Sequence, residues 1–138
     1  MDITELCLDT SILINFLKGR EPSASAVTRA VSDYPCAVTS ITVYELLFGM
    51  ARAQKQIGET ALLGVMQILP FDDAAARRAA ILHDELIRNN QEIGIKDVLI
   101  AAICLEHNLP LVTTNMNHFM RVPALRVITP QDLLVQDS

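Results

Sequence analysis

The amino-acid sequence predicts an α/β fold in which helices cover both faces of a central, mostly parallel sheet. Short apolar runs alternate along the chain with longer segments of helical periodicity, and strands that alternate with helices are typical of parallel sheets. The chain has 138 residues, of which 51% are hydrophobic, with only 5 Gly and 6 Pro. This length and composition are those of one ordered domain, expected over residues 1–138.

Five short apolar runs are expected to form the sheet. In chain order, the expected strands span residues 6–8, 36–39, 68–71, 111–113 and 126–128. In such sheets ligands bind at the carboxyl ends of the strands, usually at the point where the strand order reverses. The residues that follow each strand are therefore the first place to look for a site.

The segments between the strands are expected to be helical, with ends at cap and breaker residues. Pro22 is acceptable at the start of a helix, and Pro35 follows the end of the same helix. Ser40 and Asp72 are placed as caps of later helices. The expected helices span residues 12–18, 22–34, 41–55, 59–67, 73–90, 96–107 and 117–121.

The cysteines and the apolar segments indicate a reduced, cytoplasmic protein without a membrane anchor. Cys7, Cys36 and Cys104 form no CxxC pair, and each lies in an apolar run, so we predict three small core residues. No apolar stretch reaches the roughly 18 residues of a membrane span. Residues 1–5 lack the basic flank and apolar block of a signal peptide.

The charge balance argues at first against a nucleic-acid partner. The chain has 11 Lys and Arg against 16 Asp and Glu, a formal net charge of −5, whereas nucleic-acid-binding domains are usually basic. Most of the acids are explained by helix caps, solvated helix faces or chain ends. Three are not, and their positions change the interpretation of the charge.

These three acids lie in apolar surroundings, where a carboxylate is costly unless it is paired, hydrogen-bonded or bound to a metal. Asp9 ends the first strand, Glu45 lies well inside an apolar helix, and Asp97 begins another. Helix capping is an alternative for Asp9 and Asp97, and an ion pair with Lys96 or an arginine for Glu45. In a parallel sheet all three lie at the same edge, and converging carboxylates repel without a cation. Such oxygen ligands suit Mg²⁺ or Mn²⁺ better than zinc.

Polar residues without charge are expected at the same edge. Asn115 follows the fourth strand at the point equivalent to Asp9, so its amide oxygen could accept a hydrogen bond from a metal-bound water; a helix cap or turn is the alternative. Hydroxyl groups beside carboxylates can orient ligands or waters, although each singly is also a common cap. The candidates are Thr10, Ser11, Ser40 and Thr113.

Other chemistries fit the sequence less well. A haloacid-dehalogenase-type phosphatase needs a second aspartate two residues after the first, where this chain has Ser11. A receiver domain would have an acidic pair beside the first strand, and that pair is absent. The three histidines are too scattered for a zinc site, and the sequence contains neither a glycine-rich phosphate loop nor a GxSxG motif.

The ordered set of these segments resembles the PIN domain family and, within it, the VapC-type toxins of bacterial toxin–antitoxin modules. The resemblance spans nearly the whole chain, and its segments are Leu8-Asp9-Thr10-Ser11, residues 40–49 (SITVYELLFG), residues 93–102 (IGIKDVLIAA), and Leu111-Val112-Thr113-Thr114-Asn115 with Phe119. It implies a PIN-like three-layer α/β/α sandwich and Mg²⁺- or Mn²⁺-dependent endoribonuclease activity.

The resemblance also implies a role for each site residue. Asp9, Glu45 and Asp97 match the acidic metal site of the family, and Asn115 stands at a fourth position that is an acid in many members. We expect Asp9 and Asp97 to be direct metal ligands. Glu45 is expected to be a ligand or to orient the attacking water, and Asn115 to make a water-mediated contact. The charge of these acids is then local, so an acidic chain is compatible with a nuclease.

The partners implied by the resemblance are a cognate VapB-like antitoxin, an RNA substrate and a second copy in a homodimer. Lys96 and Arg121 are candidate phosphate contacts. The apolar residues of two expected helices exceed one narrow stripe, so some could lie in a groove or a dimer surface, and the core is the alternative. They are Ile12, Leu13, Phe16, Leu17, Tyr44, Leu47, Phe48 and Met50. Two alternatives stay open: a PIN-fold module that binds RNA or protein without cleavage, and a PIN nuclease that acts in RNA processing or on DNA without a toxin role.

Overall fold

A five-stranded sheet, with every strand parallel to its neighbours, forms the centre of the computed structural model, which describes residues 5–135. Residues 1–4, on which the signal-peptide prediction depends, lie outside the described residues. The strands are β1 (Leu6–Leu8), β2 (Cys36–Thr39), β3 (Gln67–Leu69), β4 (Leu111–Val112) and β5 (Val127–Ile128). The predicted fold class is confirmed.

The strand order β3-β2-β1-β4-β5 places β1 in the middle of the sheet. The chain adds β2 and β3 on one side of β1, then crosses back and adds β4 and β5 on the other side. The strand order therefore reverses between β1 and β4, where Leu8 pairs with Val112. This is the point at which a crevice opens beyond the carboxyl ends of parallel strands.

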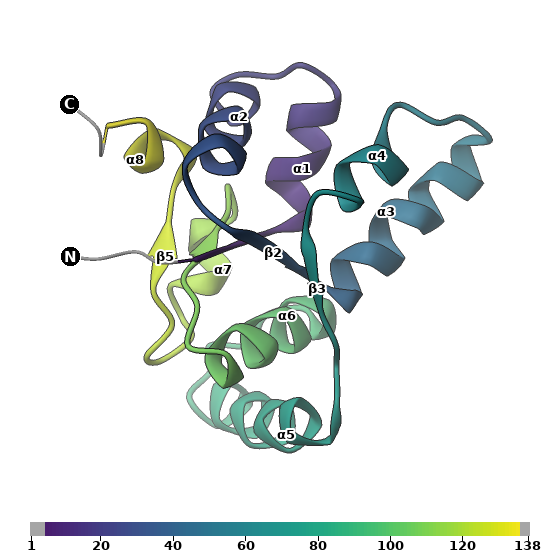
Figure 1. Ribbon diagram of the computed structural model, residues 1–138. Helices are drawn as coiled ribbons and strands as arrows, with labels where there is room; N and C mark the ends of the chain where they lie inside the picture. The colour runs from purple at the N-terminus through teal and green to yellow at the C-terminus, as the bar shows by residue number, and fades with distance from the viewer. Residues whose placement is uncertain (1–4, 136–138) are drawn as a thin grey trace.

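Helices cover both faces of the sheet (Figure 1). The helices are α1 (Thr10–Leu17), α2 (Ser23–Asp33), α3 (Ser40–Ala53), α4 (Glu59–Leu63), α5 (Asp73–Arg88), α6 (Ile95–Glu106), α7 (Met116–Phe119) and α8 (Pro130–Val135). Helices α5 and α6 lie together below the sheet in the view of Figure 1, and α1, α2 and α8 lie above it. The result is a three-layer α/β/α arrangement.

Two hydrophobic cores fill the spaces between these layers. Cys7 of β1 packs with buried side chains of α5 and α6, whereas Leu6 and Leu8 pack with those of α1 and α2. Successive residues of a strand point to opposite faces, so a strand buried on both faces needs an unbroken apolar sequence. This explains why β1 reads Leu-Cys-Leu and carries no polar residue before Asp9.

Three differences from the predicted elements have local causes. Helix α3 begins at Ser40, because the Thr39 hydroxyl accepts the hydrogen bond from the Thr42 amide at 3.2 Å. Ser40 is therefore not the cap, and its hydroxyl accepts a hydrogen bond from the Phe71 amide at 3.1 Å. The helix expected over 59–67 ends at Leu63, because the chain turns there to pair β3 with β2.

Helix α8 lies beyond the last predicted element. The apolar pattern of α8 is too short to predict a helix. The helix forms because the buried Leu133 packs against the core of α1 and α2. By contrast, the prediction for Asp72 is confirmed, since its carboxylate accepts a hydrogen bond from the Ala75 amide at 3.0 Å. Among residues 5–135, no helix combines the length and the apolar character that crossing a bilayer requires.

The cysteines are core residues, as predicted. Cys7, Cys36 and Cys104 are buried and unpaired as disulfides. A hydrogen bond with Cys104, burial and neighbouring acids raise the pKa of the Cys7 thiol well above its usual value. The Cys7 thiol therefore stays protonated, and the three buried cysteines pack as small apolar side chains.

Candidate active site

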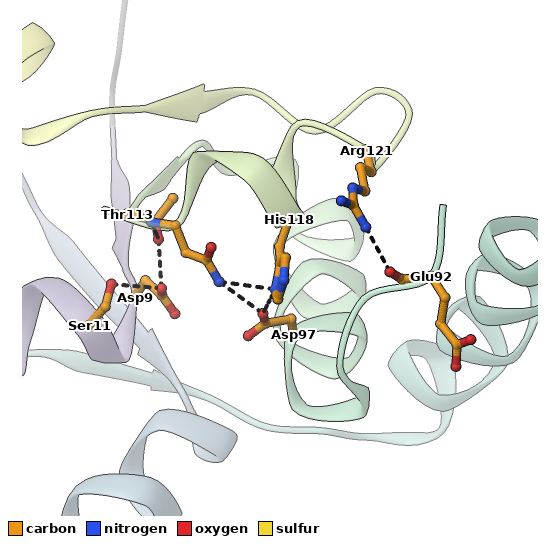
Figure 2. A network of polar contacts seen from close by, with 8 residues as sticks. Asp9, Ser11, Glu92, Asp97, Thr113, His118 and Arg121 are labelled. Carbon is orange, nitrogen blue, oxygen red and sulfur yellow. Dashed lines mark hydrogen bonds and ion pairs between the residues drawn. The ribbon is translucent and has the colours of Figure 1, made fainter. Parts of the chain in front are cut away.

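Asp9 directly follows β1, the central strand of the sheet, and only 4% of its surface is exposed. It occupies the cap position of α1, yet its side chain makes no cap hydrogen bond. Instead, Oδ2 accepts hydrogen bonds from the Thr113 hydroxyl at 2.7 Å and the Ser11 hydroxyl at 3.1 Å, as Figure 2 shows. Helix capping therefore does not explain this buried carboxylate.

The surroundings of Asp9 make its negative charge unfavourable. Burial raises the pKa of its carboxyl above the ordinary value of 3.8, and the charge of Asp97 raises it further. Hydrogen bonds from Thr113, Ser11 and the Thr10 backbone amide act in the opposite direction but do not cancel the increase. A buried carboxylate that faces a second carboxylate is an arrangement that a cation would stabilise.

Asp97 lies in the first turn of α6, where Gly94 holds the cap position. Its side chain is directed across the crevice toward α7 rather than onto its own helix. Oδ2 accepts a hydrogen bond from the Asn115 amide nitrogen at 3.3 Å and lies 2.9 Å from Nδ1 of His118. Figure 2 shows the Asp97 and His118 side chains in contact, beside Asp9 and Thr113. Capping again fails to account for the acid.

Glu45 reaches the same edge from the second turn of α3. Its Oε1 accepts a hydrogen bond from the Thr10 hydroxyl at 2.7 Å, so it is joined to the residue that follows Asp9. Its Oε2 lies 4.0 Å from Nζ of Lys96, which also stands 5.6 Å from the centre of the Tyr44 ring. The ion pair considered as an alternative is therefore present, but it is long and partly exposed.

The structure thus gathers most of the predicted site at one edge. The charge of Asp97 acts on Asp9, the hydrogen bonds of Thr113 and Asn115 connect the two acids, and Thr10 connects Glu45. Within residues 5–135, no three His, Cys, Asp or Glu side chains stand close enough to form a complete metal-binding group. Two hard oxygen donors from Asp9 and Asp97 nevertheless fit a divalent cation that keeps several waters.

Two predicted residues make their contacts elsewhere. The hydroxyl of Ser40 bonds the amide of Phe71 at the start of the loop before α5. Arg121 donates to the backbone carbonyl of Glu92 at 2.9 Å, as Figure 2 shows. Its guanidinium therefore fixes the loop before α6, and a role in phosphate binding stays a prediction.

His118 is the one residue of the site that sequence reasoning missed. The three histidines are too scattered in sequence for a zinc site, but that spacing says nothing about a single histidine beside a carboxylate. The available signal is the spacing of Asn115 and His118. Residues three apart lie on the same side of a helical turn, and α7 indeed directs both toward Asp97.

The apolar residues considered for a groove or dimer surface divide into three groups. Ile12 and Leu13 are fully buried core residues. Leu17 and Met50 line a groove of about 370 Å³ between α1 and α3, which Glu45 also borders. The half-exposed rings of α3, Tyr44 and Phe48, stack on each other with centroids 5.7 Å apart, and a homodimer through this face stays a prediction.

Comparisons with known proteins agree with this geometry. A family model described as the PIN domain matches residues 6–125. A protein named ribonuclease VapC from Rickettsia bellii is 33% identical over 132 residues, which cover 90% of this chain and 95% of the relative.

Two solved structures have the same fold. A chain of a toxin–antitoxin complex from Klebsiella pneumoniae superposes with a TM-score of 0.74 at 26% identity, over 91% of this chain and 97% of the other. A chain of VapBC2 from Rickettsia felis, bound to a DNA fragment from its promoter, superposes with a TM-score of 0.80 at 24% identity, over 91% and 98%.

Proposed function

We propose, since this chain belongs to the PIN domain family and, within it, to the VapC ribonucleases, that it cleaves RNA internally as the toxin of a toxin–antitoxin pair. The main support for this site is that two carboxylates, Asp9 and Asp97, lie near each other at the point where the strand order reverses. Substrate and partner are those indicated by the names of its relatives, a ribonuclease and a toxin–antitoxin complex.

Divalent-cation dependence is general among PIN-domain nucleases, and for this chain we propose Mg²⁺ or Mn²⁺. Asp9 and Asp97 would hold the ion, because the side-chain hydrogen bonds within the site reach only one oxygen of each carboxylate. The donors that would surround it are oxygens, which is the preference of these ions. When bound, the ion supplies positive charge to the phosphate oxygens on which negative charge develops during cleavage.

The remaining residues act on the reactants through their own hydrogen bonds. Glu45 is held at Oε1 by Thr10, which leaves Oε2 to accept a proton from the water that attacks phosphorus. The attack forms a new P–O bond and breaks the bond to the leaving oxygen, which takes up a proton. Lys96, whose Nζ lies 4.0 Å from Oε2 of Glu45, would contact a phosphate of the substrate.

The antitoxin is the partner that would silence this site. Glu45 also lines the groove between α1 and α3, so a peptide chain lying in that groove would pass close to the acidic site. A basic side chain of that peptide would be attracted to the crevice by the charges of Asp9, Asp97 and Glu45. Co-expression with a cognate antitoxin should therefore relieve growth inhibition, and an antitoxin mutated at its basic residues should not.

The decisive experiment is cleavage of RNA by the purified protein with and without metal. We expect cleavage that stops in EDTA and returns with Mn²⁺ or Mg²⁺. The Asp97→Asn variant should lose at least about 100-fold in rate, equivalent to about 2.7 kcal/mol of transition-state stabilisation. Asp84→Asn, the same change on the exposed face of α5, should keep full activity.

Two results would contradict the proposal. A protein that binds RNA equally well with and without EDTA, and cleaves none, would be a binding module. Cleavage by Asp97→Asn at the wild-type rate would place the catalytic centre elsewhere. Sequencing of RNA ends after expression of the wild type beside Asp97→Asn identifies the RNA that is cut.

A further inference from the structure

We infer that His118 is a positioning residue, which together with Asn115 fixes one oxygen of Asp97 so that the other faces the cation. The inference rests on the proposed function, because it concerns the metal site on which that function depends. Its starting point is the convergence of two side chains on the same atom. Nδ1 of His118 and the amide nitrogen of Asn115 lie 2.9 and 3.3 Å from Oδ2 of Asp97.

The contact defines which ring nitrogen carries the proton. An ionised carboxylate can only accept hydrogen bonds, so the short contact to Asp97 requires a proton on Nδ1 of His118. Nδ1 also lies 3.1 Å from the amide nitrogen of Asn115. Both nitrogens then act as donors to Asp97, and neither donates to the other. In the neutral ring, the other nitrogen, Nε2, carries no proton.

The two donors leave the second oxygen of Asp97 available. Among the described residues, no hydrogen bond reaches Oδ1 of Asp97. Asp9 repeats the pattern, since both of its side-chain donors, Ser11 and Thr113, bond Oδ2. A carboxylate held at one oxygen has a fixed orientation, which is how neighbouring residues orient the ligands of metal sites.

A connected chain of hydrogen bonds links the two carboxylates. Thr113 donates its hydroxyl to Asp9, and the same oxygen accepts from the Asn115 backbone amide at 2.9 Å. Asn115 and His118 then bond Asp97 from the same helical turn. Phe119, fully buried beside His118, anchors that turn in the core. Helix α7 therefore sets the position of Asp97 relative to Asp9.

Two substitutions of His118 distinguish the roles of its two ring nitrogens. In His118→Asn the side-chain amide nitrogen can occupy the position of Nδ1, whereas in His118→Gln it reaches only toward the position of Nε2. A positioning role through Nδ1 therefore predicts that Asn preserves what Gln loses. His107→Gln, at the exposed end of α6, is the matched control for the chemical change.

The experiment measures Mn²⁺ affinity by calorimetry, and kcat and KM on an RNA oligonucleotide, for the antitoxin-free protein. We expect His118→Gln to weaken Mn²⁺ binding by about tenfold or more, a typical loss for a residue that orients a metal ligand. Its kcat should fall while KM for RNA stays unchanged. His118→Asn should stay within about threefold of wild type in both quantities, and His107→Gln should match wild type.

Two outcomes of these measurements overturn the inference. Wild-type Mn²⁺ affinity in both His118 variants would show that the residue does not position a ligand. An equal loss of kcat in both variants with intact Mn²⁺ affinity would assign the role to Nε2 and to proton transfer.

Nitrogen NMR of the wild-type protein tests the contact between His118 and Asp97 without catalysis or metal. This test remains available if a His118 variant fails to fold. At a pH where the ring is neutral, the His118 signals should be those of the Nδ1–H form and should change in Asp97→Asn. Signals of the Nε2–H form would overturn the inference even in an active enzyme. Conversely, Nδ1–H signals in a protein that cleaves no RNA would refute the proposed function and leave the contact intact.

Discussion

The hydroxyl of Thr113 lies 2.7 Å from Oδ2 of Asp9, across 104 positions of sequence. The contact follows from strand pairing, because Leu8 and Val112, the residues before them, are register partners in β1 and β4. Each strand thus delivers one polar residue to the same point of the sheet edge. The Thr113 hydroxyl also accepts from the Asn115 amide at 2.9 Å, so it connects the end of β1 to α7.

Thr113→Val should destabilise the protein and lower its activity. Thr113 is fully buried, so the loss of its hydroxyl removes one of the hydrogen bonds to the buried Asp9 carboxylate and the acceptor of the Asn115 backbone amide. We expect a loss of about 1–3 kcal/mol in the free energy of unfolding, measured with urea, and a reduced kcat on RNA. Thr113→Ser, which retains the hydroxyl, is the control. Equal stability of the Val and Ser variants would contradict the proposed importance of this bond.

The stability of the metal-free protein should depend on pH through Asp9. Burial and the charge of Asp97 raise its pKa in the folded state above the ordinary value of 3.8. Between these two pKa values the folded state therefore binds more protons than the unfolded state. The contribution of Asp9 is therefore fully present at low pH and is lost as pH rises through the folded pKa.

The measurement compares wild type with Asp9→Asn in EDTA. The Asn variant cannot ionise, so its stability relative to wild type should increase as the pH is raised from about 3.8 toward neutrality. Adding Mn²⁺ at neutral pH should stabilise the wild type and not the variant. A stability difference that is constant with pH would show that Asp9 is not perturbed in the folded state.

Glu45→Gln should remove most of the activity and preserve the fold. The Gln carbonyl can still accept the hydrogen bond of Thr10, so the melting temperature should change little, whereas Oε2 can no longer accept a proton. We expect kcat to fall by about 100-fold. Thr10→Val should lower kcat less, because it frees the Glu45 side chain without removing it, and Thr10→Ser should restore the rate. A variant Glu45→Gln with wild-type kcat would exclude Glu45 from the reaction.

Lys96→Gln should affect substrate binding more than stability. Its contact with Glu45 is 4.0 Å long and its side chain is 53% exposed, so the ion pair contributes less than about 1 kcal/mol. We expect a higher KM for RNA and a weaker dependence of binding on salt, by about one unit in the slope of log K against log salt concentration. Arg121→Gln serves as the comparison, because its contact is with the Glu92 carbonyl. An unchanged salt dependence in both variants would mean that neither residue contacts phosphate.

The sequence alone accounts for the layers of this fold and for its acidic residues. Residues 6–8 and 36–38 are apolar throughout because both faces of a parallel sheet are covered, and this pattern is visible without a structure. Glu45 is conspicuous for the same reason, as a charge within an apolar helix. Local chemistry also predicts the cap at Asp72, since it depends only on residues three apart.

Only the tertiary structure decides how the acids are held. Asp9 and Asp97 are plausible helix caps by sequence. The pairing of β4 with β1 brings Thr113 to Asp9, and α7, which follows β4, brings Asn115 and His118 to Asp97 on α6. The role of His118 follows from a 2.9 Å contact across 21 positions. Periodicity determines which face of an element is buried, whereas the distance between two polar atoms depends on the register and packing of elements far apart in sequence.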